Sequence, residues 1–216
     1  MTPKVKENGG TRERLLEAAS RVFAKKGYRD ATIAEISRRA RANIAAVNYH
    51  FGGKRKLYVA VWHHLFGESI KVHPPDGGIP ESASPEERLH GRIGALIRRV
   101  ISPDNEFAIM EQEFGDPTGL LESSLRQAIG PLREKMIALV RELLGSKASR
   151  RQTEACVFSI MSQCMAVRRH MRLRTSVHRR SWSTPAGIDR LADHITQFSL
   201  GGIDRVRREI ESAGRD

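Results

Sequence analysis

A short predicted helix near the amino end, residues 44–50, carries small and polar side chains on one side. Apolar residues recur along it at helical spacing and predict its buried side: Ile44, Val47 and the following Phe51. The other side is expected to carry Ala45, Ala46, Asn48 and Tyr49. Alanine allows close approach and can touch a thymine methyl group, while an amide can hydrogen-bond a base edge or a phosphate. These residue types predict a helix that enters the major groove of DNA.

A second short helix must precede this one and position it. Thr32 and Glu35 have the spacing of a capping box, in which the two side chains satisfy N–H groups at the helix start. Its buried side is expected to be Ile33, Ile36 and Ala40. Residues 41–43 form the predicted turn, and Asn43 can cap the helix that follows. Two short helices joined by a tight turn are the layout of a helix-turn-helix.

Two longer helices are expected to support this pair. Thr11 can cap a helix that runs to Lys26, after which Gly27 is expected to terminate it in a left-handed conformation. The inward face of that helix is predicted to be Leu15, Leu16, Ala19, Val22 and Phe23, with Tyr28 packing back on Phe23. Another helix is expected from Lys54 to about Ile70, because its apolar residues again recur at helical spacing.

Positive charge is concentrated in the same part of the chain. Residues 1–60 contain 14 Lys and Arg against 5 Asp and Glu, so they hold +9 of the net charge of +12. The remaining 156 of the 216 residues contain 23 basic and 20 acidic residues, a net charge of +3. Attraction to phosphate requires this kind of local excess, so the distribution supports a DNA-binding segment.

Three runs in this segment resemble the DNA-binding domain of the TetR family of bacterial transcriptional regulators. They are A-T-I-A-E-I-S-R-R-A, N-I-A-A-V-N-Y-H-F and G-G-K-R-K-L-Y, and the resemblance covers about residues 10 to 70. It implies that Tyr49, His50 and Lys54 contact phosphates beside the groove, together with Thr32 of the preceding helix. The family usually has Gly in the turn where this chain has Arg41. Either the turn differs here, or Arg41 adopts a strained conformation and adds a phosphate contact.

The residues themselves leave alternatives open. Tyr49 can instead be a core aromatic, and His50 can be a packing or capping residue. Lys54 has a second argument in its favour, because the start of a helix attracts anions through its N–H groups. The DNA-contacting set is therefore predicted to be Thr32, Arg41, Asn43, Ala45, Ala46, Asn48, Tyr49, His50 and Lys54.

The rest of the chain is expected to be a second helical domain. Residues 72–84 hold three prolines and two glycines and predict a loop and a domain boundary. The domains are expected at 1–70, with a core at 11–56, and at 71–216. Runs such as S-P-E-E-R-L and S-I-M-S-Q-C-M resemble the CecR-like branch of TetR-type effector domains. The expected fold is all-α: a three-helix helix-turn-helix domain and a larger helical bundle, with about nine or ten helices in all.

The second domain is expected, by resemblance, to bind a small-molecule effector and to form a homodimer on palindromic operator DNA. A pocket is predicted from apolar, adaptable side chains: Trp62, Phe66, Met110, Phe114, Phe158, Met161 and Met165. For each of them a plain core position is the alternative. A basic cluster at Arg168–Arg180 is either a solvated face or a site for an anionic effector or nucleic acid. The chain is thus predicted to be a ligand-responsive repressor, or else a DNA-binding regulator without a small-molecule switch.

Several other classes find no support in the sequence. No nucleophile elbow, zinc spacing or paired carboxylates predict an enzyme, a metal site or a cofactor. Cys156 and Cys164 are expected to be small core residues, with redox sensing as the alternative. No apolar run approaches the roughly 18 residues of a membrane span, and residues 1–10 lack a signal-peptide core, so a cytoplasmic location is expected.

Overall fold

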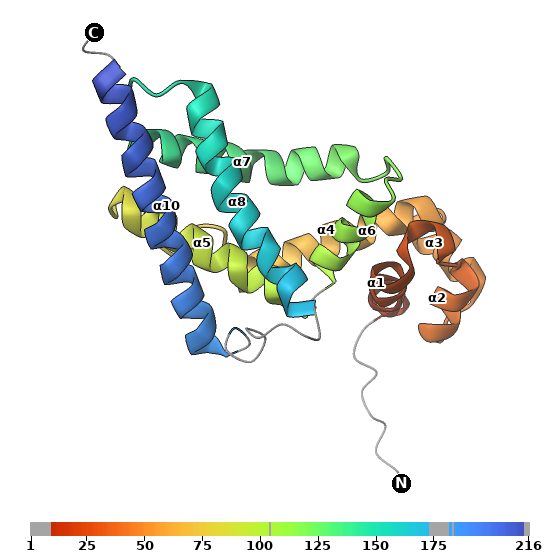
Figure 1. Cartoon of the computed structure of the whole chain (residues 1–216). Helices are drawn as coiled ribbons and strands as arrows, with labels where there is room; N and C mark the ends of the chain where they lie inside the picture. The colour runs from red at the N-terminus through yellow and green to blue at the C-terminus, as the bar shows by residue number, and fades with distance from the viewer. Residues whose placement is uncertain (1–9, 104, 173–181, 183, 214–216) are drawn as a thin grey trace. The chain divides into compact units, whose positions relative to one another are not determined.

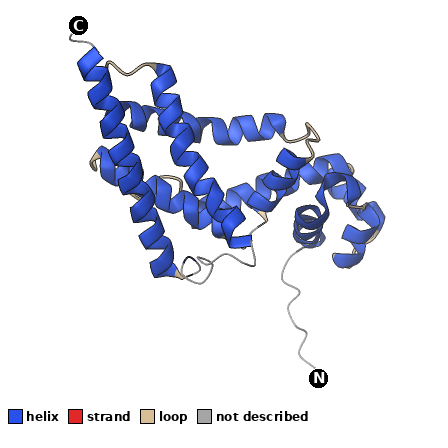
Figure 2. Cartoon of the chain, viewed as in Figure 1, coloured by secondary structure: helices blue, strands red, loops and turns tan. Residues whose placement is uncertain are grey.

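The computed structural model describes residues 10–103, 105–172, 182 and 184–213. Their regular structure is entirely helical, which confirms the all-α prediction (Figure 2). The described helices are α1 (Thr11–Asp30), α2 (Ile33–Arg39), α3 (Ile44–Phe51), α4 (Lys54–Val72), α5 (Pro85–Ile101), α6 (Glu106–Gly115), α7 (Glu122–Leu144), α8 (Arg150–Arg172) and α10 (Pro185–Ala213) (Figure 1).

The chain folds into two compact units. The first takes in Met1–Ser69 and Asp104–Gln127, and the second takes in Ile70–Pro103 and Ala128–Asp216. Helix α6 therefore belongs with the amino-terminal helices, and it packs against α1. The functional division into 1–70 and 71–216 stays a prediction, but the chain returns to the first unit after the loop that was expected to end it.

The first unit is built on α1 and an aromatic cluster. Leu15 and Phe23 of α1 are fully buried, as their helical spacing predicts. The ring of Tyr28 stacks on Phe23 with centroids 6.3 Å apart and lies 5.1 Å from the ring of Tyr58. Gly27 has a φ of 72°, as expected, yet helical structure resumes after it and α1 ends at Asp30 rather than at Lys26.

The second unit is built around α5, which packs against α8 and α10 (Figure 1). Its apolar core combines residues of α5, α7, α8 and α10, including Leu89, Ile93, Val140, Ile160, Cys164 and Ile195. Cys164 is buried, as predicted, and burial raises the pKa of its thiol to about 12. Cys156 is half-buried.

Two sequence signals for a helix break do not interrupt their helices. Pro131 predicts a kink or a split, yet α7 runs as one helix from Glu122 to Leu144. Gly201 and Gly202 predict a pause, yet α10 continues through both. Packing of the amphipathic faces overrides the helix penalty of glycine, which amounts to about 1 kcal/mol per residue.

The loop before α5 lies directly on that helix. A Cβ atom at Gly91 would approach the Asp76 carbonyl oxygen to 2.7 Å, and one at Gly77, where φ is 69°, would approach the Gly91 carbonyl oxygen to 2.3 Å. Only glycine fits at both positions. At the end of the loop Ser84 and Glu87 form a capping box, which starts α5.

Candidate DNA-binding surface

Side-chain caps fix the starts of both helices of the helix-turn-helix, α2 and α3. The Thr32 hydroxyl accepts a hydrogen bond from the Glu35 N–H at 3.2 Å, and the Asn43 side chain accepts one from the Ala45 N–H at 2.9 Å. The reciprocal half of the predicted Thr32 box is not formed. The Glu35 carboxylate instead pairs with Lys26 at 2.5 Å and with Arg39 at 3.0 Å. These partners hold the pKa of Glu35 below its usual range.

Arg41 has a φ of 51°, the only positive φ of a non-glycine residue in the part of the chain that the structure describes. The strained alternative for the turn is therefore the one that the structure adopts. A left-handed conformation costs such a residue about 1 kcal/mol or more. The side chain of Arg41 is exposed and accessible to a polyanion.

Helix α3 buries one face and exposes the other. Val47 is fully buried and Phe51 nearly so, whereas Ala45, Asn48 and Tyr49 are exposed and Ala46 and His50 are half-buried. The Tyr49 side chain is 86% exposed, which excludes the alternative that it is a core aromatic. The exposed face thus presents the small, amide and phenol side chains that the sequence indicates.

Ile44 corrects the prediction for this helix. It was expected on the buried side, yet it is 53% exposed. Ile44 is the first residue of α3 and follows the exposed cap Asn43, so helical spacing alone did not show that the first turn lies outside the core. An exposed isoleucine next to Ala45 adds an apolar group to the exposed face of α3, which the sequence pattern did not predict.

The ammonium group of Lys54 is held by the end of α1. Its Nζ donates a hydrogen bond to the Arg29 carbonyl oxygen at 3.1 Å and lies 4.5 Å from the centroid of the Tyr28 ring. Partial burial lowers the pKa of Lys54, while the charge of Asp30 raises it. The sequence placed Lys54 at a helix start but gave no signal for Tyr28 or Arg29 as its partners.

A buried carboxylate supports the same unit from α6. Glu113 accepts hydrogen bonds from the Tyr58 hydroxyl at 3.1 Å, from the Thr118 N–H at 3.0 Å and from the Gly119 N–H at 3.1 Å. Burial and the Glu113 charge raise the pKa of Tyr58, so this phenol stays protonated. The adjacent Asp116 carboxylate pairs with Arg29 at 2.8 Å, so the corner that holds Lys54 is tied to α6.

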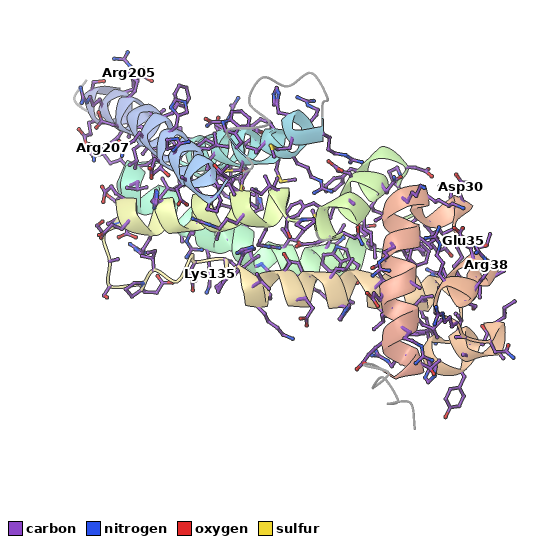
Figure 3. All side chains as sticks on the ribbon, turned by 90° about the horizontal axis from the view of Figure 1, so that it is seen from below. Asp30, Glu35, Arg38, Lys135, Arg205 and Arg207 are labelled. Carbon is purple, nitrogen blue, oxygen red and sulfur yellow. The ribbon has the colours of Figure 1, made fainter. Side chains whose placement is uncertain are left out.

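Further basic side chains lie near the caps and at the start of α4. Arg38 on α2, labelled with Glu35 in Figure 3, is exposed, as are Arg55 and Lys56. Left-handed Gly52 and Gly53 precede this turn of α4 and end α3. Because the first N–H groups of a helix lack helical partners, this basic helix start is suited to bind phosphate.

The residues predicted to form a ligand pocket fall in both units. Trp62 and Phe66 stack with ring centroids 5.2 Å apart, and both are buried in the first unit together with Met110. The Trp62 indole N–H has no hydrogen-bond partner among the described residues. The side chains of Phe114 and Phe158 are mostly exposed, and Met161 and Met165 are half-buried in the second unit.

The second unit contains a cavity of about 580 Å³ that none of these seven residues lines. It lies between the loop before α5, the start of α5 and the middle of α10. Its lining residues are Ile79, Pro80, Ala83, Glu86, Glu87, His90, Thr196, Gln197 and Leu200. This cavity was not predicted, because its walls come from segments that are about 110 residues apart in the chain.

The predictions about a metal site, a membrane span and the basic cluster can be compared with the part of the chain that the structure describes. Within the described ranges no group of three or more His, Cys, Asp and Glu is placed to hold a metal ion. No helix in those ranges is long and apolar enough to cross a membrane. Of the predicted basic cluster, Arg168 donates to the Val100 carbonyl oxygen at 3.0 Å, whereas Arg174, His178, Arg179 and Arg180 lie outside the described residues.

A capped helix-turn-helix whose second helix exposes a polar face is typical of helix-turn-helix DNA-binding proteins. Residues 15–61 match the model of the bacterial regulatory proteins of the tetR family, and residues 85–203 match the C-terminal domain of the HTH-type transcriptional dual regulator CecR. The second match alone covers more than half of the chain. The chain belongs to the TetR family of bacterial transcriptional regulators, and it is a DNA-binding regulator rather than an enzyme.

Individual relatives match over shorter stretches. The repressor NicS of Pseudomonas putida is 39% identical over 56 residues, 26% of this chain and 26% of NicS. The regulator BetI of Brucella canis is 32% identical over 87 residues, 40% of this chain and 43% of BetI. The regulator SrpR of Pseudomonas putida is 30% identical over 120 residues, 55% and 54% of the two chains. The chain thus spans about a quarter to a half of the length of these curated relatives.

Solved structures agree on the fold. A TetR-like regulator from Rhodococcus sp. RHA1 superposes with a TM-score of 0.68 at 16% identity and covers 90% of this chain and 96% of its own. The fatty acid degradation regulator FadR from Bacillus halodurans gives 0.66 at 14% identity, with 91% and 98% covered. At such low identity these likenesses concern the fold alone.

Proposed function

We propose that this protein is a ligand-responsive homodimeric repressor that binds palindromic operator DNA through α3. The single observation that carries the proposal is the exposed face of α3, whose small, amide and phenol side chains follow a capped turn. Base contacts are assigned to Ala45, Ala46 and Asn48, and phosphate contacts to Thr32, Arg41, Asn43, Tyr49, His50 and Lys54. Ile44 joins the base-contacting set, because its exposed side chain suits the methyl group of thymine.

The homodimer is supported by apolar side chains on the last two long helices. Phe158 of α8 is 74% exposed and Phe198 of α10 is 66% exposed. Large exposed apolar side chains on packed helices are typical of a protein interface. A two-fold dimer would present two copies of α3 about one helical turn of DNA, ~34–36 Å, apart.

Ligand response is supported by Trp62, whose buried indole N–H has no hydrogen-bond partner among the described residues. Buried donors are usually paired, so an acceptor supplied by a ligand would stabilise the bound state.

The second candidate is a regulator without a small-molecule switch, either an activator or one controlled by a protein partner. The closed packing around Trp62, Phe66 and Met110 favours that version. Both versions place the protein in the cytoplasm.

The proposal is tested with DNA that flanks the gene of this protein. Footprinting is expected to show a protected inverted repeat, and the protection should be lost when Asn48 and Tyr49 are both replaced by alanine. The same footprint is then repeated against a panel of small molecules, one of which should change the protected fraction. Equal affinity of the normal and the double-variant protein for the protected duplex at low salt would refute the role of α3.

A further inference from the structure

Two arginines one turn apart on α5 have very different surroundings. Arg88 is saturated with acceptors: its Nη2 donates to both carboxylate oxygens of Glu142 at 2.7 Å, and its Nε donates to the Ala83 carbonyl oxygen at 3.1 Å. Its Nη1 also lies 3.5 Å from a carboxylate oxygen of Glu81. Residues four apart share one side of a helix, so Arg92 faces the same region.

Arg92 has no such set of acceptors. The residue is only 7% exposed, yet its Nε has no hydrogen-bond partner among the described residues. The nearest carboxylate oxygen belongs to Glu81 and lies 3.8 Å from Nη2, which is beyond hydrogen-bonding distance. Glu81 is 72% exposed and is shared with Arg88, so it is a weak partner for a buried cation.

This arrangement is unfavourable for the protein by itself. The guanidinium group of Arg92 carries a positive charge into the protein interior. Buried charges are normally paired and hydrogen-bonded. The planar fork of an arginine matches a carboxylate, which can accept two parallel N–H bonds at hydrogen-bonding distance. Arg92 is therefore a binding group whose ligation is incomplete.

We propose that Arg92 anchors a small carboxylate ligand, which takes the place of the Glu81 side chain. The resident Glu81 identifies the chemistry, because it already brings a carboxylate toward the guanidinium without closing the hydrogen bond. This proposal adds a ligand class to the proposed ligand-responsive function. Only an effect of the carboxylate on operator binding rests on that function. Binding of the carboxylate can be tested separately.

The backbone around Glu81 allows this exchange without rearrangement. On one side, Gly91 and Gly77 hold the loop against α5, and the Ile79 N–H donates to the Asp76 carbonyl oxygen at 3.3 Å. On the other side, the Ala83 N–H donates to the Pro80 carbonyl oxygen at 3.0 Å. The loop is thus fixed before and after Glu81, while the exposed side chain of Glu81 can rotate into solvent.

The test measures thermal unfolding and calorimetric titration of the full chain in chloride-free buffer. The probes are acetate, benzoate and inorganic phosphate. Acetate or benzoate is expected to raise the Tm of the wild-type protein saturably. Glu81→Gln should bind the same carboxylate at least fivefold more tightly because the internal competitor is gone, whereas Glu86→Gln, a change at an exposed position of α5, should leave the affinity unchanged.

Arg92→Met separates a ligand anchor from a structural ion pair. Replacing a poorly paired buried charge by an apolar group of similar length should leave the Tm without ligand within about 2 °C and abolish the response. Arg205→Met on the exposed part of α10 should keep the response. If Arg92→Met does not fold, Arg92→Lys keeps the charge without the fork and should weaken binding at least tenfold.

Four outcomes would overturn the inference. The first is that neither the wild-type protein nor Glu81→Gln binds a carboxylate saturably, and the second is that Arg92→Met responds like the wild type. The third applies if Arg92→Met does not fold, and it is that Arg92→Lys binds as tightly as the wild type. The fourth is that the protein binds phosphate but neither acetate nor benzoate. Operator binding is measured on the same samples without anion, where Glu81→Gln and Arg92→Met should match the wild type. If the wild-type protein did not bind operator DNA under these conditions, the proposed function would be refuted, but the carboxylate site at Arg92 would not.

Discussion

Lys54 in the first unit and Arg92 in the second are both partly or fully buried cations, but only Lys54 has close partners. The ammonium of Lys54 has a carbonyl oxygen at 3.1 Å and an aromatic ring at 4.5 Å. The guanidinium of Arg92 is more deeply buried, and its nearest carboxylate oxygen is 3.8 Å away. Lys54 is positioned before any partner arrives, whereas Arg92 gains its ligation only from a partner. The first arrangement suits a phosphate of fixed geometry, and the second suits a switchable ligand.

The largest expected effect concerns the buried carboxylate that supports the first unit. Glu113→Ala removes the acceptor of Tyr58, Thr118 and Gly119 and leaves the buried Tyr58 hydroxyl without a partner, which should cost about 3 kcal/mol of unfolding free energy. Denaturant unfolding measures this loss. The matched control Glu122→Ala removes an exposed ion pair and should cost less than about 0.5 kcal/mol. Equal losses in the two variants would contradict the role of Glu113.

The next effect concerns the loop that borders Arg92. Gly91→Ala places a Cβ atom 2.5 Å from a side-chain carbon of Ile79 and 2.7 Å from the Asp76 carbonyl oxygen, so the unfolding free energy should fall by about 2 kcal/mol. Gly201→Ala meets no atom within 4 Å and lies inside α10, so it should raise stability by about 0.5 kcal/mol. Differential scanning calorimetry would show Tm shifts of opposite sign. If Gly91→Ala were more stable than the wild type, the loop would not pack closely against α5.

A smaller effect is expected for Lys54. Lys54→Ala should weaken binding to all DNA sequences alike and reduce the slope of log affinity against log salt concentration by about one. Fluorescence anisotropy at several salt concentrations measures this slope. Tyr28→Leu removes the ring beneath the ammonium and should lower affinity less, with the slope unchanged. A Lys54→Ala variant that lost only its preferred operator would show that Lys54 reads sequence instead.

The smallest effect is expected for Ile44. Ile44→Ala should lower affinity for the preferred operator by about 1 kcal/mol and leave nonspecific binding unchanged, because only an apolar contact is lost. Operators in which single thymines are replaced by uracil lack the methyl group that this contact needs. The wild-type protein should lose affinity at one such position in each half-site, and Ile44→Ala should not. Parallel losses in both proteins would show that Ile44 does not touch a methyl group.

The local features of the first unit could be predicted from the sequence because they depend on neighbours in the chain. The caps of Thr32 and Asn43, the positive φ as one alternative for Arg41, and the packing of Tyr28 on Phe23 all involve residues within a few positions of each other. Ile44 was assigned wrongly because helical spacing defines a face but not where the core ends along it. The continuous α7 and α10 were missed because distant packing decides whether a proline or glycine interrupts a helix.

The sequence by itself determined an all-α chain with a basic helix-turn-helix near its amino end, since capping residues, apolar periodicity and excess charge are properties of short stretches. Only the tertiary structure decided which charges are buried and what each of them meets. Glu113 lies 55 positions from Tyr58, Glu142 lies 54 positions from Arg88, and neither pair shares a helix. Burial and ligation of a charge depend on contacts between distant segments, so the incomplete ligation of Arg92 became visible only in the folded chain.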